Sequence, residues 1–67
     1  MTPLEIKIEL LKRQTKMAAI GRKIGVSQPA IQRVIDRDSV SERIMIAIAG
    51  AICLPKEHVF PEHEFKS

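Results

Sequence analysis

The most regular hydrophobic pattern in the chain spans residues 17–37, where apolar side chains recur at helical spacing on both sides of a glycine. Ile20 and Ile24 lie one turn apart before Gly25. Gly25 can adopt the positive φ that a sharp exit from a helix requires. The pattern therefore predicts two short helices, one over residues 17–24 and one that begins near residue 28. The second helix turns three apolar residues inward, namely Ile31, Val34 and Ile35.

The residues around this glycine favour close packing of the two helices. Gly21 is small enough to let a second helix approach, and Val26 places an apolar side chain in the angle between the helices. Ser27 can cap the second helix, and Pro29 is tolerated in its first turn, where the missing N–H would be unpaired in any case. Two helices packed across a short glycine turn form a helix-turn-helix, the unit that places its second helix in the major groove of DNA.

A polar row lies on the other face of the second predicted helix. Gln28, Gln32 and Arg33 are at or near i, i+4 spacing and project away from the apolar stripe. Glutamine can pair with adenine through two hydrogen bonds, and arginine with guanine. The same residues are also ordinary on a solvated helix face, so the row alone supports both interpretations about equally. The glycine turn and the apolar positions around it favour the first, with Gln28, Gln32 and Arg33 as base-reading residues.

The charge of the chain is segregated. The net charge is only +3, but residues 12–37 hold seven cations and one anion, a balance of +6, while the remainder carries −3. A basic centre between acidic ends is typical of a surface that faces phosphates. Thr15 or Lys16 would lie at the amino end of the first helix of the pair, where N–H groups and the helix dipole can also hold a phosphate. The residues predicted to contact DNA phosphates are Lys16, Arg22, Lys23, Ser27 and Arg37.

A helix is also predicted at the start of the chain. Thr2 and Glu5 form a capping box around Pro3, which favours a helix to about Gln14 even though residues 4–10 alternate as a strand would. This helix has two apolar stripes, of which one packs on the core and the other is free to contact a partner. A second copy of the chain on a DNA half-site is one such partner, bound through this stripe or through Ile46 and its neighbours, and a thicker core is the alternative. The stripes are Leu4, Ile8 and Leu11 on one side and Ile6 and Leu10 on the other.

The last third of the chain predicts one longer and one short helix. Ser39 and Glu42 form a capping box after a loop, which starts a helix that ends near Ile52. A short helical turn after Pro55 then brings Val59 and Phe60 back to close the core, and Pro61 ends it. The fold class is therefore all-α, a small bundle of four to five helices over residues 1–61, followed by a polar tail over residues 62–67 with little reason to order. The core-facing residues of the longer helix are Ile44 or Met45, Ile48, Ala49 and Ile52, with Ile46 off that stripe.

The composition of the chain indicates the kind of core and the cellular compartment. Hydrophobic residues make up 45% of the chain and aromatic residues only 3%, so the core must be aliphatic. One cysteine excludes an internal disulfide and suits a reducing interior. Charges begin at Glu5, unlike a signal peptide, and the apolar run of residues 44–54 is far shorter than the roughly 20 residues that cross a bilayer. These features predict a soluble, cytoplasmic protein without a membrane partner.

The segment LKRQTKMAAIGRKIGVSQPAIQRVI and the closing VFP resemble the Ner-like (Nlp) regulators of transposable phages, which have the lambda-repressor-like fold. The resemblance implies a lambda-repressor-like bundle and a transcriptional regulator that binds double-stranded DNA. It further implies a repressor of early phage or transposon genes, associated with the nucleoid of a bacterial cell or phage-infected host. The matching residues are Lys12, Arg13, Thr15, Met17, Ala18, Ala19, Gly25, Ser27, Phe60 and Pro61.

Two other classes of function were weighed against DNA binding. A protein-interaction module or antitoxin-like partner would use the aliphatic stripes, but the basic centre argues against that as the sole role. An enzyme is disfavoured, because the nearest cluster of carboxylates flanks a loop and has no histidine or metal partner in the sequence. That cluster consists of Asp36, Asp38 and Glu42.

Three residues near the end of the chain raise the question of zinc. Cys53, His58 and His63 supply only three ligands, at a spacing unlike the usual zinc patterns. A buried thiol and two surface histidines are expected instead, with no metal, no cofactor and no small-molecule ligand.

Overall fold

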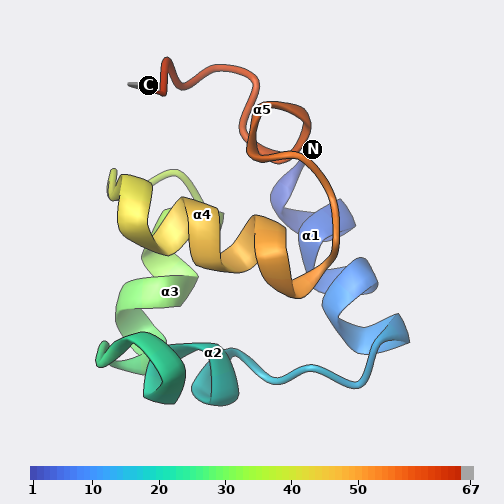
Figure 1. Ribbon diagram of the computed structural model, residues 1–67, viewed down its shortest axis with the longest axis vertical. Helices are drawn as coiled ribbons and strands as arrows, with labels where there is room; N and C mark the ends of the chain where they lie inside the picture. The colour runs from blue at the N-terminus through green and yellow to red at the C-terminus, as the bar shows by residue number, and fades with distance from the viewer. Residues whose placement is uncertain (66–67) are drawn as a thin grey trace.

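Five helices follow one another in the computed structural model, which describes residues 1–65 (Figure 1). Residues 1–65 contain no strand, and the all-α class is confirmed. Helix α4 crosses the middle of the bundle, while α5 lies beside the start of α1 (Figure 1). The helices are α1 (Pro3–Lys12), α2 (Met17–Ile24), α3 (Gln28–Ile35), α4 (Glu42–Ala51) and α5 (Lys56–Val59).

The core draws on every helix and is aliphatic, as the composition predicts. Phe60, just after α5, is the only aromatic side chain among its thirteen fully buried apolar members. Isoleucine dominates the rest. The buried isoleucines are Ile6, Ile20, Ile31, Ile35, Ile44, Ile48 and Ile52.

Helix α1 begins with the predicted capping box. Thr2 Oγ1 accepts a hydrogen bond from the Glu5 amide at 3.2 Å, and Glu5 Oε1 accepts one from the Thr2 amide at 2.8 Å. The helix ends at Lys12, two residues before the predicted end at Gln14, whose φ of 53° is left-handed. Ile6 and Leu10 face the core. The other stripe is exposed, with Leu4 at 67%, Ile8 at 41% and Leu11 at 78% of their full accessibility.

Helix α4 begins differently from the prediction. Ser41, not Ser39, is the N-cap, and its hydroxyl oxygen accepts from the Ile44 amide at 3.4 Å. Both serines precede Glu42 closely enough to cap, so the pattern of residue types did not separate them. The predicted core face is confirmed, and Ile46 is exposed. The buried members are Ile44, Met45, Ile48 and Ala49, followed by Ile52.

The segment after Pro61 is more engaged than a polar tail with little reason to order. Glu62 is bonded to Arg37 of the bundle, and His63 Nε2 lies 3.1 Å from Glu42 Oε1. The Phe65 ring packs edge-on against His63 and contacts the core. The rest of the predicted tail, residues 66–67, lies outside the described residues.

Candidate nucleic-acid interface

The turn between α2 and α3 has the geometry that the sequence predicts. Gly25 is left-handed, with φ of 75°, and its N–H donates to the Gly21 carbonyl. The Val26 N–H donates to the same carbonyl at 2.9 Å. A Cβ added at Gly21 would lie 2.5 Å from the Val26 carbonyl oxygen, so this position needs glycine for the close approach. Helices α2 and α3 are thus held in a helix-turn-helix.

Helix α3 buries the predicted stripe and exposes the opposite face. Ser27 is the N-cap, but its side chain makes no capping hydrogen bond, so the hydroxyl is available to another partner. Gln28 and Arg33 are exposed, whereas Gln32 is half-buried. None of these three side chains is fully buried, and the surface of α3 that bears them is open.

One further residue of this face, Asp36, was not predicted from the sequence. Asp36 follows Gln28 and Gln32 at i+8 and i+4, and its side chain is exposed beside theirs. Its carboxylate accepts a hydrogen bond from Gln32 Nε2 at 2.7 Å and one from Lys7 Nζ of α1 at 3.3 Å. The Gln32 hydrogen bond, with a smaller contribution from Lys7, lowers the pKa of the Asp36 carboxyl below its ordinary value. The i+4 spacing from Gln32 was the signal that could have found it.

A shallow hollow of about 290 Å³ lies where α1, the α1–α2 link and the starts of α2 and α3 meet. Lys16 and Gln28 both line it, so a predicted phosphate contact and a predicted base contact are neighbours. Lys16 is the N-cap of α2 and makes no side-chain capping bond there. Ala18 lines the hollow too, and the exposed Arg22 lies one turn further along the same side of α2. The structure therefore places Lys16 and Arg22 on the side of α2 that adjoins Gln28.

Lys23 lies elsewhere. It lines a second hollow, of about 580 Å³, between α2 and α4, together with Ala19 and Gly50. Its side chain is exposed but directed to the α4 side of the helix pair. This difference could not be predicted from the sequence, because Arg22 and Lys23 are adjacent and only the packing of α4 separates their surroundings.

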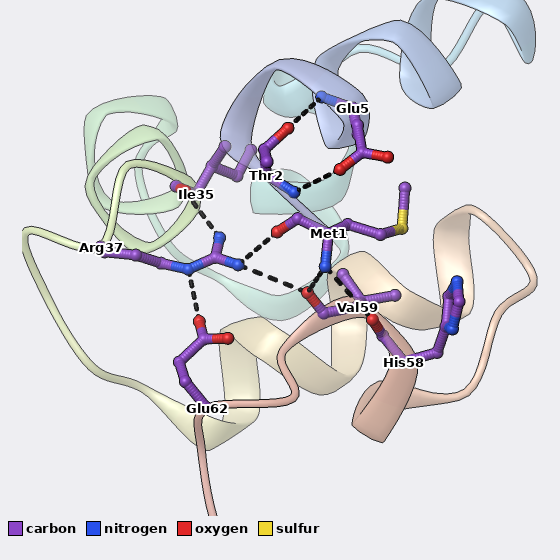
Figure 2. A network of polar contacts seen from close by, with 8 residues as sticks. All are labelled: Met1, Thr2, Glu5, Ile35, Arg37, His58, Val59 and Glu62. Carbon is purple, nitrogen blue, oxygen red and sulfur yellow. Dashed lines mark hydrogen bonds and ion pairs between the residues drawn. The ribbon is translucent and has the colours of Figure 1, made fainter.

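Arg37, the fifth predicted phosphate contact, is bound within the protein (Figure 2). Its Nε donates to Glu62 Oε1 at 2.5 Å, and its Nη1 donates to the Ile35 carbonyl at 2.8 Å. Its Nη2 reaches the carbonyls of Met1 at 2.5 Å and Val59 at 3.4 Å. The guanidinium carbon also lies 4.7 Å from the centre of the Phe60 ring. Arg37 thus ties the end of α3 to both ends of the described chain, and each of its three nitrogens already donates a hydrogen bond within the protein.

Comparison with known proteins agrees with this geometry. Residues 1–66 match the family of winged helix-turn-helix DNA-binding domains. The chain belongs to that family. The family establishes a DNA-binding helix-turn-helix protein; it does not distinguish the Ner-like regulators within that class. No curated protein and no solved structure gives a significant match.

The family is described as winged, but all the regular secondary structure in residues 1–65 is helical. The helix-turn-helix is therefore the feature that this part of the chain shares with the family description. No helix in that part of the chain is long and apolar enough to cross a membrane. Among the same residues, no group of three histidine, cysteine or acidic side chains is placed to hold a metal ion. Cys53 is exposed, which corrects the prediction of a buried thiol.

Proposed function

We propose that this protein is a sequence-specific transcriptional regulator that reads the major groove of double-stranded DNA with α3. The observation that carries the proposal is the open face of α3, where Gln28 and Arg33 are exposed and the segment after Pro61 does not cover them. That segment instead packs on Arg37 and Glu42. A face that carries glutamine and arginine side chains at the start of the second helix suits base edges in the groove.

The residues divide by role. Gln28, Gln32 and Arg33 are proposed to read bases, Arg33 alternatively binding a phosphate. Lys16 and Arg22 lie on the side of α2 next to Gln28 and are proposed to bind phosphates of the flanking backbone. Ser27 joins them, because its hydroxyl makes no capping bond. Lys23 and Arg37 are left out of this set, the first because it faces α4 and the second because its donors are occupied.

We further propose that the output is repression of a phage, prophage or transposon type. The support is the resemblance of residues 11–35 and the closing VFP to Ner-like regulators. A domain of this kind represses by occupying a promoter, which needs no enzymatic activity, cofactor or small-molecule ligand.

Selection of bound duplexes from a random DNA library tests the groove-reading role. Gln28→Ala is expected to remove the preference at one base pair, a change of about 1–3 kcal/mol there, and to leave the others intact. An unchanged selected motif would refute the placement of α3 in the groove.

Salt dependence tests the phosphate contacts. Lys16→Ala is expected to weaken binding to all sequences alike and to reduce the slope of log K against log salt by about 0.9. Lys23→Ala is the matched control, since it removes the same charge from the other side of α2 and should change the slope less. Equal effects of the two variants on the salt dependence would refute the assignment of the phosphate contact to the Lys16 side of α2.

A homodimer on DNA is also proposed, with the exposed stripe of α1 as the contact. Leu4, Ile8 and Leu11 are the apolar residues on that side of α1, and Glu5 and Lys12 flank them with opposite charges. An antiparallel pair of α1 helices would set Glu5 of each copy near Lys12 of the other. Such a dimer would bind half-sites about 34 Å apart. Sedimentation of the protein alone and with a selected duplex tests this, and one copy per duplex would refute it.

The same stripe supports the second candidate, a protein-interaction module or antitoxin-like partner. In that case the chain would co-purify with another protein and show no measurable affinity for DNA at moderate salt. The two candidates therefore differ in a single binding measurement.

A further inference from the structure

The side-chain amide of Gln32 is held in one orientation. An ionised carboxylate only accepts hydrogen bonds, so the group 2.7 Å from Asp36 Oδ2 must be the amide nitrogen of Gln32 and not its oxygen. Lys7 Nζ bonds the other carboxylate oxygen at 3.3 Å, which fixes Asp36 in turn and balances its charge. Among residues 1–65, Gln32 Oε1 has no hydrogen-bond partner, so an acceptor is the unpaired end of this amide.

We propose that Asp36 determines the base preference of Gln32, by holding its amide nitrogen so that Oε1 faces the major groove as an acceptor. Asp36 is thus a positioning residue for specificity, supported by Lys7 from α1. The proposal deepens the proposed function and rests on it, because it requires α3 to lie in the groove.

The chemistry of the bases makes the preference specific. Adenine and cytosine present an amino group in the major groove, at N6 and N4, whereas guanine and thymine present the acceptors O6 and O4. A glutamine whose oxygen faces the groove accepts a hydrogen bond from the amino group of adenine or cytosine. The same oxygen is repelled by the lone pairs of the guanine or thymine oxygen. A free glutamine would not discriminate in this way, since its amide can rotate to offer either end. The held amide therefore selects adenine or cytosine on the strand that Gln32 contacts.

Replacement of Asp36 by asparagine tests the orientation. The asparagine side chain offers one acceptor and one donor in place of two acceptors. The Lys7 ammonium takes the acceptor, because a second donor beside it would be repelled. The asparagine NH₂ then faces Gln32 and draws the Gln32 amide oxygen toward position 36, so that the Gln32 amide nitrogen faces the groove. Asp36→Asn is expected to change an amino-base preference of about tenfold at this position into no preference or a keto-base preference.

Two matched variants separate this proposal from the proposed function. Asp38→Asn makes the same change of charge two residues further on, where the carboxylate is exposed and has no side-chain partner among the described residues, so it should leave the preferred base unchanged. Gln32→Ala should erase the preference at the position. If Gln32→Ala leaves the selected motif intact, then Gln32 does not read a base and both proposals fail at this residue. If it erases the preference but Asp36→Asn leaves the amino base preferred, then only the role of Asp36 is refuted.

A measurement on the free protein checks the contact without DNA. In ¹⁵N-resolved NMR spectra, the Gln32 side-chain NH₂ protons should be shifted and slowed in exchange relative to those of Gln28, and Asp36→Asn should abolish the difference. Asp38→Asn should not. Identical Gln32 signals in the wild type and in Asp36→Asn would overturn the proposal. The dispersion of signals in the same spectra shows whether the variant is folded.

Discussion

Replacement of Arg37 by alanine should separate a structural arginine from a DNA-contacting one. The side chain is 28% exposed and donates to the Glu62 carboxylate and to carbonyls of two other segments. Hydrogen bonds that involve a charged group contribute about 1.5–3 kcal/mol each when protected, and a cation that is still partly exposed to solvent gains about 0.5–1 kcal/mol from lying over an aromatic ring. Because solvent and side-chain entropy discount several of these contacts, we expect a total loss of about 2–4 kcal/mol.

That loss is large for this chain. A domain of 67 residues has a free energy of unfolding of about 3–10 kcal/mol, and each kcal/mol changes its Tm by about 4–8 °C. Arg37→Ala should therefore lower the Tm by about 10–25 °C. Thermal unfolding followed by far-ultraviolet circular dichroism measures this change in Tm, since the chain has no tryptophan for fluorescence.

Two further variants make the test sharp. Arg33→Ala removes the same type of side chain from the last turn of α3, but Arg33 is exposed and unpaired among the described residues, so stability should change by less than about 0.5 kcal/mol while DNA affinity falls. Arg37→Gly should be about 1 kcal/mol more stable than Arg37→Ala, because φ at this position is 66° and glycine tolerates that conformation. Equal stability of Arg37→Ala and Arg33→Ala would refute the structural role of Arg37.

Other predictions concern packing and pH. Gly21→Ala should destabilise the fold by about 1–3 kcal/mol, since its Cβ would meet the Val26 carbonyl oxygen at 2.5 Å. Gly50→Ala, in a helix with nothing within 4 Å of the new Cβ, should stabilise it by about 0.5–1 kcal/mol; thermal melts of both variants check the contrast. Partial burial alone would raise the pKa of Glu62, but its own backbone amide and the Arg37 guanidinium lower it below the ordinary 4.5. Because the folded state then binds fewer protons, the stability from this contact is present above pH 4.5 and is lost on acidification below it. In urea titrations at pH 3–7, Glu62→Gln should lose less of its free energy of unfolding on acidification than the wild type.

Local rules predicted the helices well because each signal acts within a few residues. The capping box at Thr2, the left-handed Gly25 and the inward stripe of α3 depend on neighbours in the chain and were all confirmed. The N-cap of α4 failed by two residues, since Ser39 and Ser41 offer the same chemistry and only the path of the loop selects Ser41.

Contacts between distant segments could not be predicted from such rules. The partners of Arg37 lie 25 and 36 residues away at Glu62 and Met1, and the Lys7 contact that positions Asp36 spans 29 residues. Charge counting placed Arg37 in the basic centre because it counts a cation whether or not its donors are already occupied. Arg33 in α3 is unpaired among the described residues, whereas Arg37, two residues after the end of α3, is bound because distant parts of the chain bring partners to it.

The last residues of the core have a consequence for synthesis. Val59 and Phe60 are fully buried against a bundle that begins with Ile6, so the apolar interior closes only once residues 59–60 have reached it. On the ribosome, the first four helices can emerge with their inner faces still open to solvent. Folding of this bundle then waits until residues 59–60 have left the exit tunnel, and a nascent chain that stalls while α5 is still inside would be left exposed to chaperones and proteases.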